Sequence, residues 1–183
     1  MKAALCKSLD GPEGIALEEL HEPTPGPGEV RIRVKAAGLN FLDTLITRGK
    51  YQYKPDLPFS PASEVAGEID LIGPDVQSFA PGQRVCAYLG WGGARELVIA
   101  RAEHVTPVPD GVSDVVAAGL NVTYGTAMHG LRDRARLKPG ETVAVLGASG
   151  GAGLAAVEVA KRLGARVIAV ASSPEKLEIC RQH

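Results

Sequence analysis

A glycine-rich turn between an apolar strand and a helix constrains the fold of this chain more than any other feature. Thr142–Leu146 is a β-branched, apolar run without turn residues, which predicts a strand buried on both faces. The turn 147–153 follows it, then apolar residues at helical spacing over 154–163, and then a second apolar run over 165–171. These segments predict a βαβ unit, which is the context in which a glycine turn binds a dinucleotide.

The turn also indicates how a pyrophosphate would be bound. Gly150 and Gly151 lack a Cβ, so the backbone can approach an anion closely, and the next helix directs its free N–H groups and positive dipole end there. Gly153 allows the helix to pack close to the strand, and Ala148 stands where the usual fingerprint has its first glycine. A tight turn in another kind of α/β sheet is the alternative. The expected cofactor contacts are Ser149, Gly150, Gly151, Ala152 and Gly153.

Charge and cysteine content exclude several functional classes. The net charge of −1 favours neither nucleic acid nor an anionic membrane as a partner. Cys6, Cys86 and Cys180 are widely spaced, which suits a reducing compartment and offers neither a disulfide framework nor a metal knuckle. No signal peptide and no apolar run of membrane-spanning length is found. We therefore expect a cytoplasmic protein without a membrane or nucleic-acid partner.

The chain before the βαβ unit is rich in glycine, proline and short strand patterns. Val30–Ala37 alternates cleanly between apolar and basic residues, as a half-buried antiparallel strand does. A short helix is expected over 40–48, and strands are expected over 3–6, 30–37, 64–72, 82–88 and 94–99. This pattern is typical of a Greek-key or barrel-like region. Helices are expected over 115–120 and 123–131, and they place a domain boundary between residues 118 and 119.

The end of the chain carries too few strands for a doubly wound sheet. A last helix is expected from Pro174 to Cys180, so the second domain would have two parallel strands. Such sheets need several strands and cover on both faces. We therefore expect the N-terminal part of a longer protein.

Several motifs follow one another along the chain, over 37–43, 48–51, 57–67, 82–85, 92–96 and 137–153. Together they resemble the zinc-independent quinone oxidoreductases of the medium-chain dehydrogenase/reductase superfamily, the ζ-crystallin-like group. Position 62 is alanine, where that family usually has glycine.

The resemblance implies an α/β plus β fold. Residues 1–118 would form a GroES-like β-barrel domain for substrate and catalysis, and residues 119–183 the first part of a Rossmann domain for NADPH. The complete protein would have nearly twice this length and would be a homodimer.

The resemblance also implies a set of site residues outside the glycine turn. Asn40 and Tyr51 would be catalytic and would orient the acceptor oxygen by hydrogen bonds, and the side chains of both can donate one. Phe41 and Asp43 would lie by the cofactor, with Asp43 also fixing the loop, and Thr126 would touch the nicotinamide amide. Asn40 acting only as a helix cap, and Tyr51 acting only in packing, are the alternatives.

A catalytic zinc would need a cluster of cysteine and histidine ligands, which this sequence lacks. Zinc-dependent relatives place a cysteine where this chain has Leu39-Asn40, and Gly-His-Glu where it has Ala62-Ser63-Glu64. The four histidines have no ligand spacing. We expect no metal, and Glu64 is either a remnant of a metal site or a structural carboxylate paired with a nearby base.

The end of the second strand predicts NADPH over NADH. An NAD enzyme usually has Asp or Glu there for the ribose 2′-hydroxyl, whereas this chain has Ser172 and Ser173, followed by Lys176 in the first helical turn. In the family that the chain resembles, a serine and a lysine at these positions hold the 2′-phosphate. The alternative is that a serine only caps the helix and Lys176 is solvated. Glu175 favours that alternative.

These expectations lead to three functional hypotheses. The first is an enzyme that transfers a hydride from NADPH to a quinone, with no nucleophile but with the acceptor and the nicotinamide held face to face. The second is a reductase of enones or enoyl thioesters. The third is a non-catalytic, crystallin-like protein that keeps NADPH binding. We expect residues 1–183 alone to have little activity.

Overall fold

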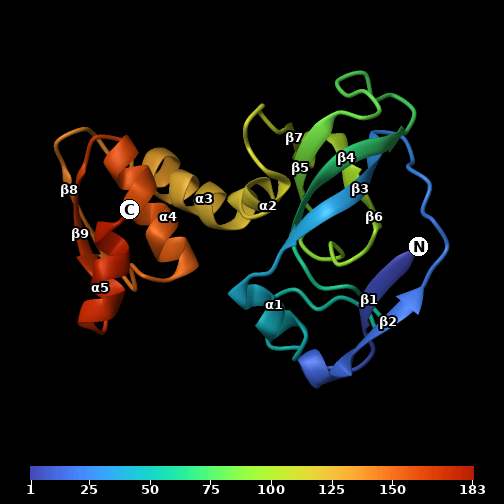
Figure 1. Ribbon diagram of the computed structural model, residues 1–183, viewed down its shortest axis with the longest axis horizontal. Coiled ribbons are helices and arrows are strands. Elements are labelled where there is room, and N and C mark those ends of the chain that lie inside the picture. Colours follow the sequence, from blue (N-terminus) through green and yellow to red (C-terminus); the bar gives the residue numbers. More distant parts are fainter. The chain divides into compact units, whose positions relative to one another are not determined.

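The computed structural model describes all residues, Met1–His183, and divides into two compact units. We call them the N-terminal unit, Met1–Gly119, and the C-terminal unit, Leu120–His183. Figure 1 shows the elements of each unit. We describe each unit by itself.

The N-terminal unit is built on a five-stranded antiparallel sheet in the order β6-β3-β4-β5-β7. The long strand β3 (Glu29–Gly38) pairs along most of its length with β4 (Glu64–Ile72) on one side, and its first half, Glu29–Arg33, pairs with β6 (Leu97–Arg101) on the other. Strand β5 (Arg84–Tyr88) lies between β4 and the short β7 (Val105–Pro107). The sheet therefore brings together segments that are far apart in the sequence.

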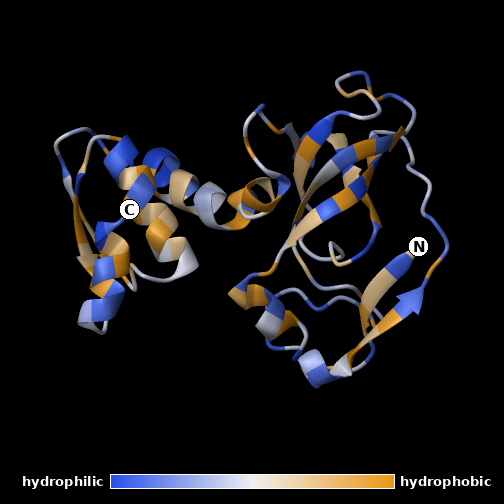
Figure 2. Ribbon diagram, viewed as in Figure 1, coloured by the Kyte–Doolittle hydropathy of each residue, from blue (hydrophilic) through white to orange (hydrophobic).

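Alternation along these strands forms the core of the N-terminal unit. In β3, Val30 and Ile32 are fully buried, while Arg31 and Arg33 on the other face form ion pairs with Asp70 of β4. Figure 2 shows this alternation of apolar and polar residues along β3 and β4. The buried core cluster consists of Val30, Ile32, Val65, Ile69, Val85, Ala87, Val98, Ala100 and Val105.

A second, two-stranded antiparallel sheet consists of β1 (Lys2–Cys6) and β2 (Ile15–Glu19), joined through a 3₁₀ turn (Pro12–Gly14). Single bridges join β1 to Arg95 and Phe59. No hydrogen-bonded pairing joins β6 to β7, so the five-stranded sheet stays open and the expected β-barrel does not close. β7 is too short to complete a barrel, since it has three residues and ends at Pro107, which has no N–H to donate.

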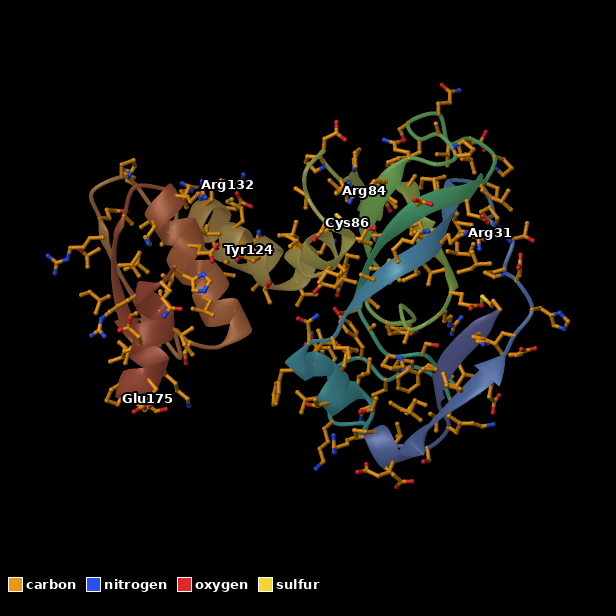
Figure 3. All side chains as sticks on the ribbon, viewed as in Figure 1. Arg31, Arg84, Cys86, Tyr124, Arg132 and Glu175 are labelled. Carbon is orange, nitrogen blue, oxygen red and sulfur yellow. The ribbon has the colours of Figure 1, made fainter.

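Two short helices accompany this sheet. Helix α1 (Phe41–Ile46) follows β3 directly, and α2 (Asp114–Ala117) packs on β3, β4 and β5. Ser113 caps α2 by accepting a hydrogen bond from the backbone N–H of Val116. Arg84 of β5, labelled in Figure 3, donates to Asp114 and to the carbonyl of Val112, which fixes α2 to the sheet. A 3₁₀ turn (Ala102–His104) connects β6 to β7.

The C-terminal unit contains the βαβ unit expected from the sequence. Strand β8 (Thr142–Leu146), helix α4 (Gly151–Arg162) and strand β9 (Arg166–Val170) follow one another, and the two strands pair in parallel. Helix α3 (Leu120–Met128) precedes them and continues into a π-helical turn (His129–Arg134) that packs on α4. Helix α5 (Pro174–Arg181) follows β9.

The strands of the C-terminal unit are covered on one face. Side chains of β8, β9, α4 and α5 pack together there, around the buried residues Val145, Ala148, Val157 and Cys180. On the other face Leu146 is 78% exposed, and Ile168 and Val170 are 44% and 41% exposed. Within residues 1–183 the expectation of burial on both faces is not met, because both adjoining helices pack on the same side chains. None of the helices combines the length and apolar character that crossing a bilayer would take.

Candidate functional site

The turn between β8 and α4 has one glycine for each of three geometric demands. Gly147 has a φ of 65°, the left-handed conformation that a side chain would strain. A Cβ on Gly150 would meet only the carbonyl oxygen of Gly147, in ordinary van der Waals contact at 3.5 Å. A Cβ on Gly153 would lie 2.3 Å from the carbonyl oxygen of Gly147, so only glycine fits. Gly147 thus makes the sharp turn, which explains how Ala148 can replace the usual first glycine.

The start of α4 presents unpaired backbone donors. Gly150 is the N-cap residue, and no side chain caps the helix. The first N–H groups of a helix have no partner within it, so those of Gly151, Ala152 and Gly153 are available to a ligand. Helix α4 is long enough, at 12 residues, for its dipole to add to their attraction for an anion. This turn can therefore bind a phosphate group through its main chain.

The segment after β9 lies at the same edge of the sheet as this turn. The two strands are parallel, and the backbone N–H of Ala148 donates to the carbonyl of Val170 at 3.0 Å. Beyond Val170, Lys176 Nζ donates to Ser172 Oγ at 3.0 Å. Ser173 is the N-cap residue of α5 and accepts from the backbone N–H of Lys176. The structure thus brings together the glycine turn and all three predicted ribose-end residues.

Glu175, labelled in Figure 3, is the carboxylate nearest to this segment in sequence. A hydrogen bond from the Ser173 hydroxyl, helped by one from its own backbone N–H, holds the pKa of Glu175 below its usual value. Ser173 therefore serves both the helix cap and Glu175 in this conformation. A phosphate at Ser173 would compete with that carboxylate for the hydroxyl proton.

Helix α3 contributes a residue that the sequence analysis missed. A Cβ placed on Gly151 would lie 3.6 Å from Thr123 Cγ2, so Thr123 is next to the glycine turn. The predicted contact residue, Thr126, is exposed one helical turn farther along α3. The helical period alone offers both threonines as candidates, and only the packing of α3 on α4 separates them.

In the N-terminal unit, Asp43 is a buried carboxylate that fixes two loops. It is 6% exposed, and its Oδ2 accepts from the backbone N–H of Asn40 at 2.8 Å. Its Oδ1 accepts from the backbone N–H of Ala62, also at 2.8 Å. Ala62 is a fully buried alanine with a φ of 69°. Both oxygens of Asp43 are thus engaged by the main chain, as expected for a loop-fixing residue, and its contact with a cofactor remains a prediction.

Asn40 lies between two carboxylates, one on each side. Besides its backbone bond to Asp43, it donates from Nδ2 to Glu64 Oε1 at 2.9 Å. Glu64 begins β4 and is 1% exposed. Asn40 is also the N-cap residue of α1, so the capping alternative is part of its role. The contact with Asn40 is one to an amide, and the pairing of Glu64 with a base stays a prediction.

Tyr51 is half-buried and packs against the apolar cluster of Cys6, Ile46 and Phe59. Its ring meets that of Tyr53 edge to face, with the centroids 5.7 Å apart. Phe41, at the first position of α1, is 78% exposed. Packing thus explains the position of the Tyr51 ring. Its hydroxyl has no hydrogen-bond partner in the chain.

Tyr88 is a second residue that the sequence analysis missed. It ends β5 directly opposite Glu64 of β4, so the two side chains share one face of the sheet. Burial raises the pKa of Tyr88, and the negative charge of nearby Tyr53, Tyr51 and Glu64 raises it further. Tyr88 therefore lies near the predicted catalytic residues as a neutral phenol. No sequence signal could have found it, because it depends on the pairing of β4 with β5.

Metal-ligand chemistry is absent from both units. No group of three or more His, Cys, Asp and Glu side chains lies where it could hold an ion. The three cysteines are buried and unpaired. Ser63, where zinc-dependent relatives would carry histidine, is fully buried, and its hydroxyl has no hydrogen-bond partner.

Comparisons with known proteins cover the whole chain. Residues 26–110 match the alcohol dehydrogenase GroES-like domain family. The chain is 40% identical over 182 residues to quinone oxidoreductase-like protein 2 of Rattus norvegicus, covering 99% of this chain and 51% of the relative. It is 40% identical over 174 residues to a quinone oxidoreductase of Pseudomonas aeruginosa, covering 94% and 53%.

Solved structures give the same result for the fold. The quinone oxidoreductase of Thermus thermophilus, whose structure was also determined in complex with NADPH, has a TM-score of 0.87 and 40% identity. That comparison covers 100% of this chain and 57% of the other. The chain spans about half the length of the curated relatives it matches.

Proposed function

The chain belongs to the quinone oxidoreductase family of the medium-chain dehydrogenase/reductases, and from that premise we propose that the protein carrying it reduces quinones with NADPH. The observation that carries the proposal is the shared sheet edge of the C-terminal unit. Unpaired N–H groups at the start of α4 and the Lys176–Ser172 pair after β9 both lie there.

The residues at this edge fit a dinucleotide with a 2′-phosphate. The N–H groups of Gly151, Ala152 and Gly153 bind the pyrophosphate, and the lack of a side chain at Gly150 lets it come close to the backbone. Lys176 turns from Ser172 to the 2′-phosphate, where a charge-assisted hydrogen bond forms. When bound, the reduced nicotinamide supplies the hydride.

On the acceptor side, the N-terminal unit supplies hydrogen-bond donors in place of a metal. The Asn40 amide and the Tyr51 hydroxyl orient the carbonyl oxygen of the quinone and stabilise the charge that develops on it. Zinc independence of the reaction stays a prediction. A homodimeric state and a cytoplasmic location stay predictions.

Cofactor choice is tested by titrating a protein of the relatives' full length with NADPH and with NADH. We expect Lys176→Ala to weaken NADPH binding about tenfold, the usual worth of a charge-assisted hydrogen bond, and to leave NADH binding unchanged. Lys138→Ala is the matched control, because Lys138 is an exposed lysine of the same unit outside this edge. Equal loss for both nucleotides would contradict the role of Lys176.

The acceptor is tested with a panel of quinones, enones and enoyl thioesters. We expect quinone turnover that falls in Asn40→Ala and in Tyr51→Phe, with NADPH affinity retained. Reduction of enoyl thioesters alone would favour the alkene reductase hypothesis. Tight NADPH binding without turnover of any acceptor would favour a non-catalytic protein.

A further inference from the structure

Glu64 is a buried carboxylate to which the proposed reaction assigns no role. It is 1% exposed at the start of β4, and its side chain lies against the backbone of Gly38 in the paired strand β3. A Cβ on Gly38 would lie 2.7 Å from Glu64 Cγ and 2.9 Å from Oε1. The space for this carboxylate thus exists because position 38 has no side chain.

The contact with Asn40 fixes which way its amide faces. A carboxylate accepts hydrogen bonds and donates none, so the nitrogen of the Asn40 amide must face Glu64. The Asn40 side-chain oxygen then faces the backbone N–H of Asp43, in the capping box at the start of α1. One N–H of the amide is left without a partner.

The backbone of Asn40 is held as well. Asp43 accepts its N–H at 2.8 Å and fixes Ala62 by its other oxygen. Ala62 is two residues before Glu64, so one carboxylate secures both ends of the Asn40–Glu64 contact. Neither side chain has to be ordered when an acceptor binds, which lowers the entropic cost of using the free N–H.

We propose that Glu64 is a positioning residue, which turns the Asn40 amide so that its free N–H meets the carbonyl oxygen of the acceptor. The opposite orientation would present the amide oxygen to the acceptor oxygen, and two lone pairs would repel. Leu39 and Phe41, which flank Asn40, are 75% and 78% exposed and apolar, as suits an acceptor with a carbonyl on a hydrocarbon ring. This inference rests on the proposed quinone reduction.

A double-mutant cycle at Glu64 and Asn40 tests the proposal in the full-length protein. We expect Glu64→Gln to lower kcat/KM for a benzoquinone about tenfold, because an amide can turn either group toward Asn40. NADPH affinity should change less than twofold. In the Asn40→Ala background, Glu64→Gln should have no further effect. A full tenfold loss in that background, or unchanged kinetics in the single variant, would overturn the proposal.

Two further variants separate positioning from folding. Glu68→Gln removes a carboxylate from the same strand, where Glu68 forms an exposed ion pair with Lys35, and should leave kcat/KM unchanged. Glu64→Asp keeps the charge but shortens the reach, and should lose acceptor turnover with the fold retained. If Glu64→Gln fails to fold, Glu64→Asp completes the cycle with Asn40→Ala, and additive losses would again overturn the proposal.

A spectroscopic readout keeps this inference separate from the proposed function. In an NMR spectrum of the ¹⁵N-labelled full-length protein, the Asn40 side-chain proton bonded to Glu64 should shift upfield in Glu64→Gln and stay in place in Glu68→Gln. If the shift is present but quinones are not reduced, the proposed function is wrong and the orientation of the amide is still supported. An unmoved Asn40 signal would sink the positioning role itself, whatever the activity.

Discussion

The two units build their candidate sites from different material. In the C-terminal unit the site is main chain: glycines without side chains and the unpaired N–H groups at the start of α4. In the N-terminal unit it is side chains, with Asn40 held between the buried carboxylates of Asp43 and Glu64. The first site depends on space being left empty, and the second on hydrogen bonds being satisfied away from water.

This difference decides how each site fails. A main-chain site fails when an added atom closes the turn, since close-packed backbone has nowhere to move. A carboxylate-held site fails when a partner is removed, because buried N–H groups then lose their acceptor.

The single tryptophan, Trp91, lies in the N-terminal unit, so its fluorescence reports on that unit, while NADPH binding reports on the other.

The largest effect is expected from adding a methyl group at Gly153. Its Cβ would lie 2.3 Å from the carbonyl oxygen of Gly147 and 2.8 Å from Ala148 Cα, so the turn must distort. We expect Gly153→Ala to destabilise the C-terminal unit by about 3 kcal/mol and to weaken NADPH binding roughly 100-fold. Fluorescence titration measures the binding.

Gly150→Ala is the matched control for that variant. The nearest atom to its Cβ would be 3.5 Å away and its φ is −81°, so the turn should keep its structure. NADPH binding should still weaken, by about tenfold, because the methyl group occupies the space of the pyrophosphate. Equal destabilisation by both alanines would break the comparison, since the turn would then need glycine at position 150 for its structure too.

The next largest effect is expected in the N-terminal unit, at Asp43. Asp43→Ala leaves the backbone N–H groups of Asn40 and Ala62 without their acceptor, which costs about 3 kcal/mol. Urea denaturation followed by Trp91 fluorescence measures the loss, and Asp43→Asn should cost less because it keeps one acceptor oxygen. A loss under about 1 kcal/mol would show that water replaces the carboxylate, and the side-chain site would not depend on it.

The same difference explains what the sequence could predict. The glycine turn, its helix and the residues Ser172, Ser173 and Lys176 are close together along the chain, and their pattern alone predicted the βαβ unit. The contacts of the N-terminal site join positions 40 and 43 to positions 62, 64 and 88, which are far away along the chain and come close only in the fold. Asn40 was therefore predicted without its partner Glu64, and Tyr88 was missed.

Two errors about the sheets have physical causes. Apolar runs in β8 and β9 predicted burial on both faces, but composition does not say how many neighbours a strand has, and Leu146 lies exposed. Short strands carry little sequence pattern, so β2 and β7 were not predicted. Because β7 is the edge strand at which the five-stranded sheet stays open, the open sheet was not predicted either.

A smaller effect is expected from the ion pairs of the N-terminal unit, and it depends on pH. Burial alone would raise the pKa of Asp70, but hydrogen bonds and charge from Arg31 and Arg33 outweigh it, so its pKa is lowered from 3.8. A lowered pKa in the folded state contributes stability above pH 3.8, which is lost as the pH falls through the folded value. Asp70→Asn should therefore cost about 1–2 kcal/mol at neutral pH, and the difference from the parent should shrink below pH 3.8.

Urea denaturation at a series of pH values, followed by Trp91 fluorescence, measures this dependence. Glu68→Gln is the control, because its ion pair with Lys35 is exposed and should contribute little at any pH. A constant cost of Asp70→Asn across the acid range would mean that the packing of Asp70, and not its charge, stabilises the sheet.

The smallest effect is expected at Ala62, which combines a glycine-like backbone conformation with a hydrogen bond to a buried carboxylate. It is an alanine in the left-handed conformation, with a φ of 69°, held there by the Asp43 carboxylate. Ala62→Gly relieves a backbone strain of about 1–2 kcal/mol. It also removes a buried methyl group and increases the conformational entropy of the unfolded chain, and these two losses together are of similar size. We expect a net change within about 0.5 kcal/mol of zero. Ala66→Gly, at a fully buried alanine within β4, has no strain to relieve and should cost about 1.5 kcal/mol. If both variants lost the same free energy of unfolding, Ala62 would be unstrained. Backbone positions that require glycine would then be a feature of the C-terminal site alone.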